Sequence, residues 1–343
     1  VKAVFNHLQD SCTHNFTVGI KDDITQLSIP VDEHVEIEND EVTQCIFWGY
    51  GSDGTVSANK NAIKIIGDDF DIHVQGHFVY DSKKSGGVTI SHLRFGKNNI
   101  QSEYEITNAD FVALHKPSYI GRYDILEHIK ENGIFLINSS WSPNEVMDNL
   151  TEQMKQIIHE RNINVFTIDA YAIAKEVGLG KRINTIMETA FFKLTTILTD
   201  DKAIDAIKRH ITTQFKTKGD DVVAMNHSAV DKAVSEIKEV QTTSESQHSI
   251  PEKAIIPDDA GEFATNIIKP IAHLKGNDIP VSQMPVNGAV PLSTSRLEKR
   301  GVATNVPEWN PETCIQCGMC SFVCPHSAIR MKQIHPDDLK SKP

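Results

Sequence analysis

The stretch CIFWGYGSDGT, residues 45–55, is an apolar run that leads directly into a glycine-rich turn. Its glycines, Gly49, Gly51 and Gly54, have the spacing G-x-G-x-x-G, and residues 56–66 follow with apolar side chains at roughly helical spacing. The order predicts a strand, a tight turn and a helix. A helix N-terminus reached through glycines can bind a phosphate, because its free N–H groups and partial positive charge face the turn. A tight turn without a ligand is the alternative.

The residues after this unit alternate between apolar strands and amphipathic helices. We expect strands within residues 72–80, 88–95, 111–114, 134–137 and 165–168, and helices within residues 123–131, 145–161, 182–198, 203–215 and 225–240. Val88, Ile90 and Leu93 are expected on the inner face of their strand. Alternation of this kind predicts an α/β fold with a mostly parallel, doubly wound sheet.

The flanking segments have different compositions. At ~150 residues per domain, 343 residues suggest roughly two domains. We assign residues 41–242 to the α/β domain and residues 1–40 to the end of a preceding domain and a linker, with a short strand within residues 16–20. Residues 243–300 hold six of the chain's 14 prolines and predict an extended connector. Residues 301–343 carry a cysteine cluster.

The overall charge restricts the possible partners. Lys and Arg number 34 and Asp and Glu 46, so the formal charge is −12. A broad basic face for nucleic acid is therefore not expected. No stretch approaches the ~18 consecutive apolar residues of a membrane-spanning helix, and no leader precedes the chain, so we expect a cytoplasmic protein. Because the chain begins at Val1 without Met, we expect either a processed protein or a segment of a longer one.

Four of the six cysteines lie close together. Cys314, Cys317, Cys320 and Cys324 follow the pattern C-x2-C-x2-C-x3-C-P, which is the bacterial ferredoxin spacing for a [4Fe–4S] cluster. A tight loop with thiolates three residues apart can wrap one cluster, and Gly318 allows the backbone to pass close to it. A disulfide framework or a zinc site suits this spacing less well.

The cysteine run is incomplete by itself. In two-cluster ferredoxins the fourth cysteine ligates the other cluster, and a second run is missing here. The remaining cysteines lie far upstream: Cys45 within an apolar strand, where we expect a small core residue, and Cys12 without a ligand context. This chain alone should not hold two complete clusters.

Two further groups of residues are candidates for binding anions. Lys83 and Lys84 follow the strand that ends near Asp81. A lysine pair suits a phosphorylated ribose better than the bare diol of NAD, and coenzyme A carries such a phosphate; a solvated loop is the alternative. Arg182 and Asn184 open a long helix after two glycines and could contact an anion, or act only as a surface charge and a cap. We interpret His77, His92 and His115 as structural.

Many of these motifs resemble the middle of pyruvate:ferredoxin (flavodoxin) oxidoreductases. The matching stretches are GSDGTV at 51–56, YDSKKSGG at 80–87, SHLRFG at 91–96, HKPSY at 115–119, LINSSW at 136–141, RINT at 182–185, PVNGAVPL at 285–292 and the cysteine run at 314–329. The resemblance spans essentially the whole chain.

The resemblance implies a place for each segment. Residues 1–40 are similar to the end of a transketolase-C-terminal-like domain, 41–242 to the domain that contacts coenzyme A, 243–300 to a wrapping connector, and 301–343 to the start of a two-cluster ferredoxin domain. The implied coenzyme A contacts are Gly51, Ser52, Asp53, Gly54, Thr55, Lys83, Lys84, Arg182 and Asn184, and the implied cluster ligands are the four C-terminal cysteines.

The resemblance also implies an activity. Family members convert pyruvate and coenzyme A to acetyl-CoA and CO2 with thiamine diphosphate, and electrons pass through [4Fe–4S] clusters to ferredoxin or flavodoxin. We expect no catalytic residue in this segment, an inactive isolated chain, thiamine diphosphate on domains missing here, and a homodimer of the full-length protein. Three alternatives stay open: an electron-transfer or nucleotide-binding module, an NAD-dependent dehydrogenase, and an enzyme for another 2-oxoacid such as 2-oxoglutarate.

Overall fold

The chain divides into two compact units, Val1–Val302 and Ala303–Pro343. The computed structural model describes residues 1–10, 13–31, 41–51, 53–81, 87–195, 197–198, 200–242, 248–253, 255–257, 259–297, 307–325, 327–333 and 335. Within this described part, no helix is long and apolar enough to cross a membrane.

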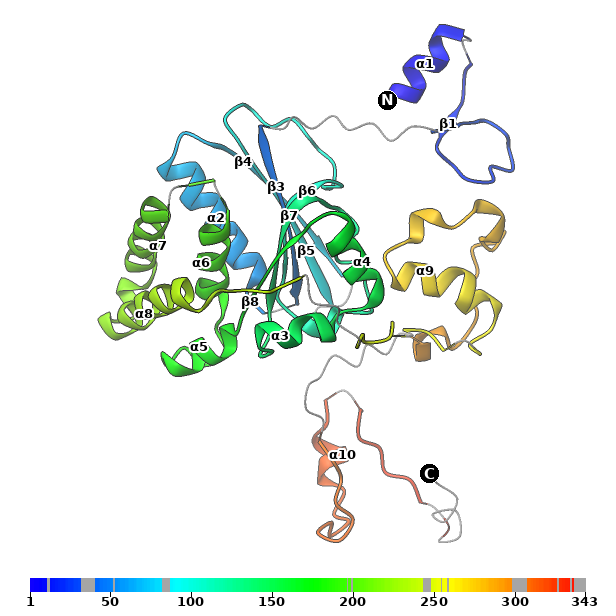
Figure 1. Cartoon of the computed structure of the whole chain (residues 1–343). Helices are drawn as coiled ribbons and strands as arrows, with labels where there is room; N and C mark the ends of the chain where they lie inside the picture. The colour runs from blue at the N-terminus through cyan, green and yellow to red at the C-terminus, as the bar shows by residue number, and fades with distance from the viewer. Residues whose placement is uncertain are drawn as a thin grey trace. The chain divides into compact units, whose positions relative to one another are not determined.

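A seven-stranded sheet forms the centre of the first unit (Figure 1). Its strand order is β4-β5-β3-β6-β7-β8-β9. The four central strands run parallel: β3 (Val42–Tyr50), β6 (Ala109–Leu114), β7 (Ile129–Asn138) and β8 (Asn164–Ile168). The other three are antiparallel to their neighbours: β4 (His73–Tyr80), β5 (Val88–Gly96) and β9 (Lys238–Glu239). The predicted α/β fold is confirmed, with a parallel centre and antiparallel edges.

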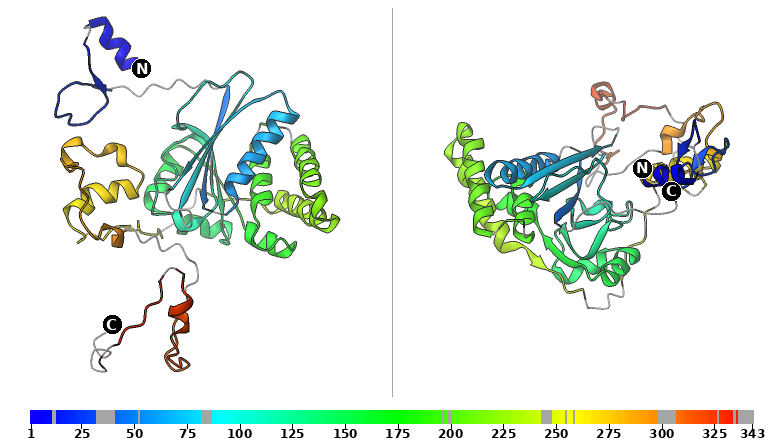
Figure 2. Two further views of the ribbon diagram at one scale, coloured as in Figure 1. Left: turned by 180° about the vertical axis from the view of Figure 1, so that it is seen from behind. Right: turned by 90° about the horizontal axis from the view of Figure 1, so that it is seen from above.

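Helices cover both faces of this sheet, as Figures 1 and 2 show. One face carries α2 (Thr55–Asp69), α5 (Ala170–Glu176), α6 (Asn184–Leu194), α7 (Asp200–Phe215) and α8 (Asp220–Glu236). The other carries η1 (Pro117–Tyr119), α3 (Pro143–Val146), η2 (Met147–Asn149) and α4 (Glu152–Glu160). Alternate residues of β3 therefore reach opposite cores: Cys45 and Phe47 pack in one cluster, Ile46 and Trp48 in the other. This explains the continuous apolar run in β3.

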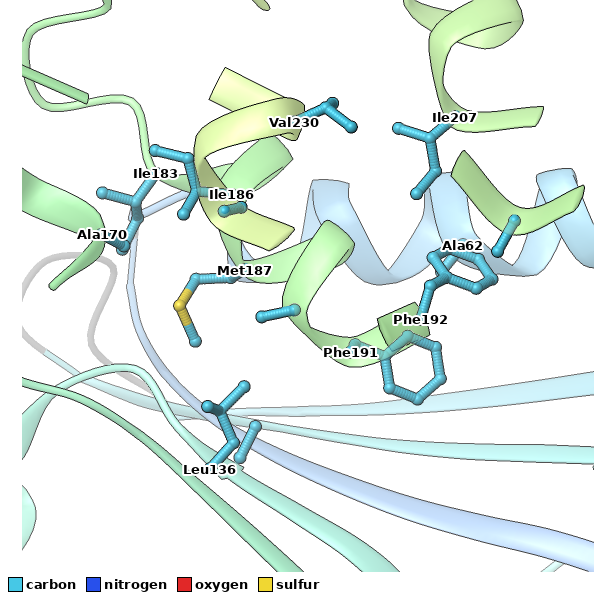
Figure 3. Close-up of a cluster of buried hydrophobic side chains, with 14 of the residues drawn as sticks. Ala62, Leu136, Ala170, Ile183, Ile186, Met187, Phe191, Phe192, Ile207 and Val230 are labelled. Carbon is cyan, nitrogen blue, oxygen red and sulfur yellow. The ribbon is translucent and has the colours of Figure 1, made fainter. Parts of the chain in front are cut away.

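The face covered by α2 and α5 to α8 holds the larger of these two apolar clusters. Figure 3 shows Phe191 and Phe192 of α6 between the sheet residue Leu136 and the helix residues Ala62 and Ile207. The ring of Phe191 lies 5.2 Å from that of Phe47 and 5.3 Å from that of Phe111, measured between centroids. These contacts pack the last turn of α6 against β3 and β6.

Of the expected helices, one is wrong and another is interrupted. Residues 125–128 form turns rather than a helix, and β7 already begins at Ile129. The apolar residues whose spacing suggested a helix, Ile125, Leu126 and Ile129, are buried in the second cluster although the backbone there is not helical. The helix expected within residues 145–161 is broken before α4, because the side chain of Thr151 caps α4 by accepting a hydrogen bond from the Met154 N–H.

Three smaller expectations also need correction. Helix α6 ends at Leu194 rather than near 198, since Thr195 is extended and its hydroxyl donates to the Phe191 carbonyl. Helix α8 ends at Glu236 rather than near 240, and β9 begins at Lys238. Leu93 points to the opposite face from Val88, because successive strand residues alternate and the two positions differ by an odd number.

The flanking segments contain short elements. Before the sheet come α1 (Lys2–Asp10) and a two-stranded sheet of β1 (Thr17–Val18) and β2 (Ser28–Ile29). After it come η4 (Ala264–Ile268), α9 (Lys269–Ala272), η5 (Gly276–Asp278), η6 (Val281–Gln283) and η7 (Thr294–Leu297). The backbone N–H of Lys253 donates to the Gly121 carbonyl at 2.7 Å, which joins this connector to the α/β domain. The second unit contains α10 (Met319–Val323).

Candidate functional site

The loop from Gly49 to Thr55, hereafter the glycine loop, lies at the carboxyl end of β3. The Asp53 carboxylate accepts hydrogen bonds from the N–H groups of Tyr50 and Thr55, both at 2.8 Å. The Gly51 N–H donates to the Gly87 carbonyl at 2.8 Å. Gly54 has a left-handed φ of +91° at the start of α2, a conformation that glycine adopts readily. Asp53 therefore shapes the loop from within.

Thr55 connects the glycine loop to the neighbouring strand. Its side chain fills the space beside Gly49, where an added β-carbon would come within 2.6 Å. Its hydroxyl lies 2.8 Å from Nδ1 of the buried His115, which follows β6. Burial lowers the pKa of His115, against the opposing charge of Asp53, so the imidazole is neutral. These contacts agree with the structural interpretation of His115.

A hollow of 520 Å³ opens beside the glycine loop. Its wall includes Val56 and Ser57 in the first turn of α2, and Tyr80, Asp81 and Gly87 at the ends of the neighbouring edge strands. The N-cap residue Gly54 supplies no side-chain acceptor, and the first turn of α2 carries no acidic residue. The first N–H groups of a helix lack intrahelical partners. That of Thr55 donates to Asp53, so the donors that α2 offers at the hollow are those of Val56 and Ser57, and the carboxylates of Asp53 and Asp81 also line it.

Asn184 reaches the glycine loop from a distant part of the chain. An added β-carbon on Gly54 would come within 2.9 Å of the Asn184 side-chain amide. The N-cap of α6 is Ile183, so Asn184 is not the cap of its helix. The structure therefore brings two of the predicted site residues, Gly54 and Asn184, into contact.

The other predicted contact residues are placed less closely or lie outside the described part. Arg182 is exposed just before α6, and within the described residues its side chain forms no hydrogen bond or ion pair with the loop. Ser52, Lys83 and Lys84 lie outside the described residues. Asp81 and Gly87, which flank the lysine pair, both line the hollow.

Two residues near the hollow were missed by sequence reasoning. The Lys116 ammonium lies 5.8 Å from the centroid of the Tyr50 ring, which lines the hollow. The Tyr119 hydroxyl donates to the Gly87 carbonyl at 3.3 Å, and burial raises the pKa of this phenol. Both follow the carboxyl end of β6, the edge at which open α/β sheets bind ligands. Their position after a buried parallel strand was the signal that could have found them.

The second unit presents the cysteine run. Cys314, Cys317, Cys320 and Cys324 are free thiols. Hydrogen bonds from the Trp309 side chain and the Gln316 backbone lower the pKa of Cys314. The Ala328 N–H donates to the Cys324 sulfur at 3.3 Å. Four thiols with N–H donors to sulfur are the donor chemistry of an iron–sulfur cluster.

The thiols are not gathered around one point in this ligand-free chain. Among the residues described, no three His, Cys, Asp or Glu side chains converge closely enough to hold a metal ion. The donor set, four thiols at ferredoxin spacing, fits an iron–sulfur cluster. Cys45 is fully buried, which confirms it as a core residue, and Cys12 lies outside the described residues.

Comparison with known proteins gives matches over most of the chain. Residues 44–236 match the family model of pyruvate ferredoxin/flavodoxin oxidoreductase. Residues 250–303 match a domain of unknown function, and residues 307–330 match a 4Fe-4S binding domain. The matched regions therefore place an oxidoreductase domain before an iron–sulfur domain along the chain. The chain belongs to the pyruvate ferredoxin/flavodoxin oxidoreductase family.

Named relatives agree with this family. Pyruvate:ferredoxin oxidoreductase of Moorella thermoacetica is 49% identical, and pyruvate-flavodoxin oxidoreductase of Trichormus variabilis is 42% identical, each over 100% of this chain. The chain spans 29% of the length of each. A pyruvate oxidoreductase subunit from Thermotoga maritima aligns with 59% of this chain and 100% of its own, at a TM-score of 0.46 and 20% identity.

Proposed function

We propose that this chain is the central part of a longer enzyme that oxidatively decarboxylates pyruvate with coenzyme A. In this proposal acetyl-CoA and CO2 are the products, and ferredoxin or flavodoxin receives the electrons. Support comes from the names of the relatives that match the whole chain, one of which acts with ferredoxin and another with flavodoxin. The chain contributes a surface for coenzyme A and part of an electron relay, and by itself it is inactive.

The proposed coenzyme A site rests on the hollow beside the glycine loop. It combines the N–H groups of Val56 and Ser57 in the first turn of α2, a glycine with left-handed φ and an adjoining amide from Asn184. Lys83 and Lys84 follow Asp81, which lines the hollow, and supply positive charge for phosphates. We assign Gly51, Ser52, Asp53, Gly54, Thr55 and Asn184 to the loop side of this site, and Arg182 to its rim. Binding at the nucleotide positions the distant thiol of coenzyme A.

The cysteine run forms the other functional part. We propose that Cys314, Cys317, Cys320 and Cys324 ligate [4Fe–4S] clusters together with a second run elsewhere in the full-length protein. When bound, such clusters supply one-electron transfer at low potential. Thiamine diphosphate binds to other domains of the full-length homodimer. The free thiols favour a cytoplasmic location, where cysteines stay reduced.

The segment boundaries follow from this assignment. Residues 1–40 complete a preceding transketolase-C-terminal-like domain, and residues 41–242 form the domain that contacts coenzyme A. Residues 243–300 are the connector, and residues 301–343 begin the ferredoxin-like domain.

The first experiment is an immunoblot of the source cell with antibodies against residues 42–240. A single band several times heavier than 38.2 kDa supports the proposal, and that species should reduce a viologen dye only with pyruvate and coenzyme A together. A band at 38.2 kDa contradicts a single-chain enzyme. Dye reduction with 2-oxoglutarate instead of pyruvate would identify another 2-oxoacid as the substrate.

Binding by the full-length protein tests the coenzyme A site directly. The double variant Lys83→Ala/Lys84→Ala should weaken coenzyme A binding by about tenfold or more, because hydrogen bonds to charged groups contribute roughly 1.5–3 kcal/mol. The exposed Lys64→Ala on α2 is the matched control and should bind normally. Tight binding of NAD without binding of coenzyme A would favour the dehydrogenase alternative.

A further inference from the structure

Helix α6 carries a buried carboxyl group, that of Glu188. This residue is 7% exposed, and in the part of the chain that the structure describes its Oε1 has no hydrogen-bond partner. On α2, Nδ2 of the buried Asn59 has no partner among the described residues either. Neither residue lines the hollow beside the glycine loop. Buried polar groups are normally satisfied, so two unsatisfied ones on helices that pack together call for an explanation.

The packing of the two helices places Glu188 at their interface. At the start of this interface the amide of Asn184 lies against Gly54. Further along, Phe192 of α6 and Ala62 of α2 pack in the same apolar cluster (Figure 3). Glu188 is one turn from each of the two α6 residues, so the three side chains lie on one face of α6. The carboxyl group is therefore buried between α6 and α2, one turn beyond the contact that reaches the glycine loop.

The surroundings of Glu188 favour its neutral form. Burial raises the pKa of this carboxyl to about 8, and no charge among the described residues offsets the effect. The sheet presents the neutral His115, and α5 presents Tyr171, whose pKa burial raises. The charged side chains described on α2, α5, α7 and α8 are at least partly exposed, and several form contacts there: Lys60 with the Phe78 ring, Arg209 with Asp69, Lys208 with Asp231 and Lys232 with Glu176. At neutral pH the carboxyl is therefore protonated.

We propose that protonated Glu188 is a positioning residue: it keeps α6 packed against α2, and so keeps Asn184 against Gly54. The proposal rests on the function proposed above and adds control by pH to it. An ionised carboxylate between two helices loses its hydration, so it moves toward water and draws Asn184 away from Gly54. Only the protonated fraction then has the arrangement that binds coenzyme A. That fraction is about one half at pH 8 and about one tenth at pH 9.

The test measures the affinity of the full-length protein for coenzyme A by calorimetry between about pH 7 and pH 9. The wild type should lose up to about tenfold in affinity over this range. Glu188→Gln, which keeps the shape of the side chain but cannot ionise, should bind as the wild type does at pH 7 and vary by less than about twofold. Titration of coenzyme A itself cancels in the ratio of the two proteins. The exposed Glu103→Gln is the control and should keep the wild-type profile.

Asn184→Ala distinguishes positioning from a purely structural role of Glu188. It removes the side chain through which Glu188 acts, so affinity should already be lower at pH 7 and the further fall toward pH 9 should disappear. A melting curve at each pH shows that each variant is folded under the conditions of binding.

The outcomes that overturn the proposal are specific. A wild-type pH profile in Glu188→Gln would do so, and so would an undiminished fall in Asn184→Ala. If the wild type binds coenzyme A equally at all these pH values, only this inference fails. If it binds no coenzyme A at pH 7, the proposed function and this inference fail together.

Discussion

The side-chain amide of Asn184 lies against Gly54, 2.9 Å from where a β-carbon on that glycine would stand. Gly54 begins α2 and Asn184 begins α6, so this contact joins the N-terminal ends of two helices that pack side by side. The glycine is therefore required twice: for its left-handed φ, and for the space that Asn184 occupies. Gly54 also lines the 520 Å³ hollow at the N-terminus of α2.

Gly54→Ala should lower both stability and coenzyme A affinity. The left-handed backbone alone costs roughly 1–2 kcal/mol for a residue with a β-carbon, and Asn184 must also move. Gly261→Ala is the matched control, because its φ is +93° but no atom lies within 4 Å of an added β-carbon. Adding Asn184→Ala to Gly54→Ala should recover part of the lost stability in urea unfolding. No recovery would mean that the contact with Asn184 does not matter.

Thr55→Val should destabilise the protein although valine has nearly the same shape. It removes the hydroxyl that lies 2.8 Å from Nδ1 of the buried His115, and an unsatisfied buried polar group costs about 1–3 kcal/mol. Thr55→Ser keeps the hydroxyl and should retain most of the stability. The measurement is the free energy of unfolding in urea, and equal values for Thr55→Val and the wild type would contradict the prediction.

Glu188 should make stability depend on pH. Burial in α6 raises its pKa from 4.5 to about 8, and its Oε1 has no hydrogen-bond partner. Between these two values the folded state binds more protons than the unfolded state, so the free energy of unfolding falls as pH rises, by up to about 1.4 kcal/mol per pH unit. Above pH 8 this contribution stops changing.

Glu188→Gln removes this titration and should flatten the dependence between pH 5.5 and 8. Unfolding in urea at several pH values measures the slope for each variant. The exposed Glu103→Gln should keep the wild-type slope. An unchanged slope in Glu188→Gln would show that other groups cause the dependence.

Alkylation should distinguish the accessible cysteines from the buried one. Iodoacetamide reacts with accessible thiolates, so cluster-free native protein should be labelled at Cys314, Cys317, Cys320 and Cys324. Cys45 is fully buried, and burial raises the pKa of its thiol far above the ordinary value, so it should react only after denaturation. Mass spectrometry of peptides reads each site. Bound cluster should protect the four C-terminal thiols, and rapid labelling of native Cys45 would contradict its place in the core.

Several features of the fold could be predicted because their signals are local. The apolar run of β3, the glycine turn and the amphipathic α2 each depend on residues a few positions apart. The helix expected at residues 123–131 failed for the complementary reason. Ile125, Leu126 and Ile129 have helical spacing, but their burial against a sheet face is equally satisfied by turns and the start of β7. Apolar spacing predicts which residues are buried, but it does not always predict whether they lie in a helix or in turns and a strand.

Residue types at short spacing were enough to predict the family, the α/β alternation, the glycine loop and the cysteine run. The contacts of Asn184 with Gly54, of His115 with Thr55 and of Lys253 with Ser118 appear only in the tertiary structure. These pairs come from strands, helices and connector segments far apart in the chain. Their contacts arise when two apolar faces of one sheet are buried by different helices, and no local pattern records which polar groups then meet at its edge.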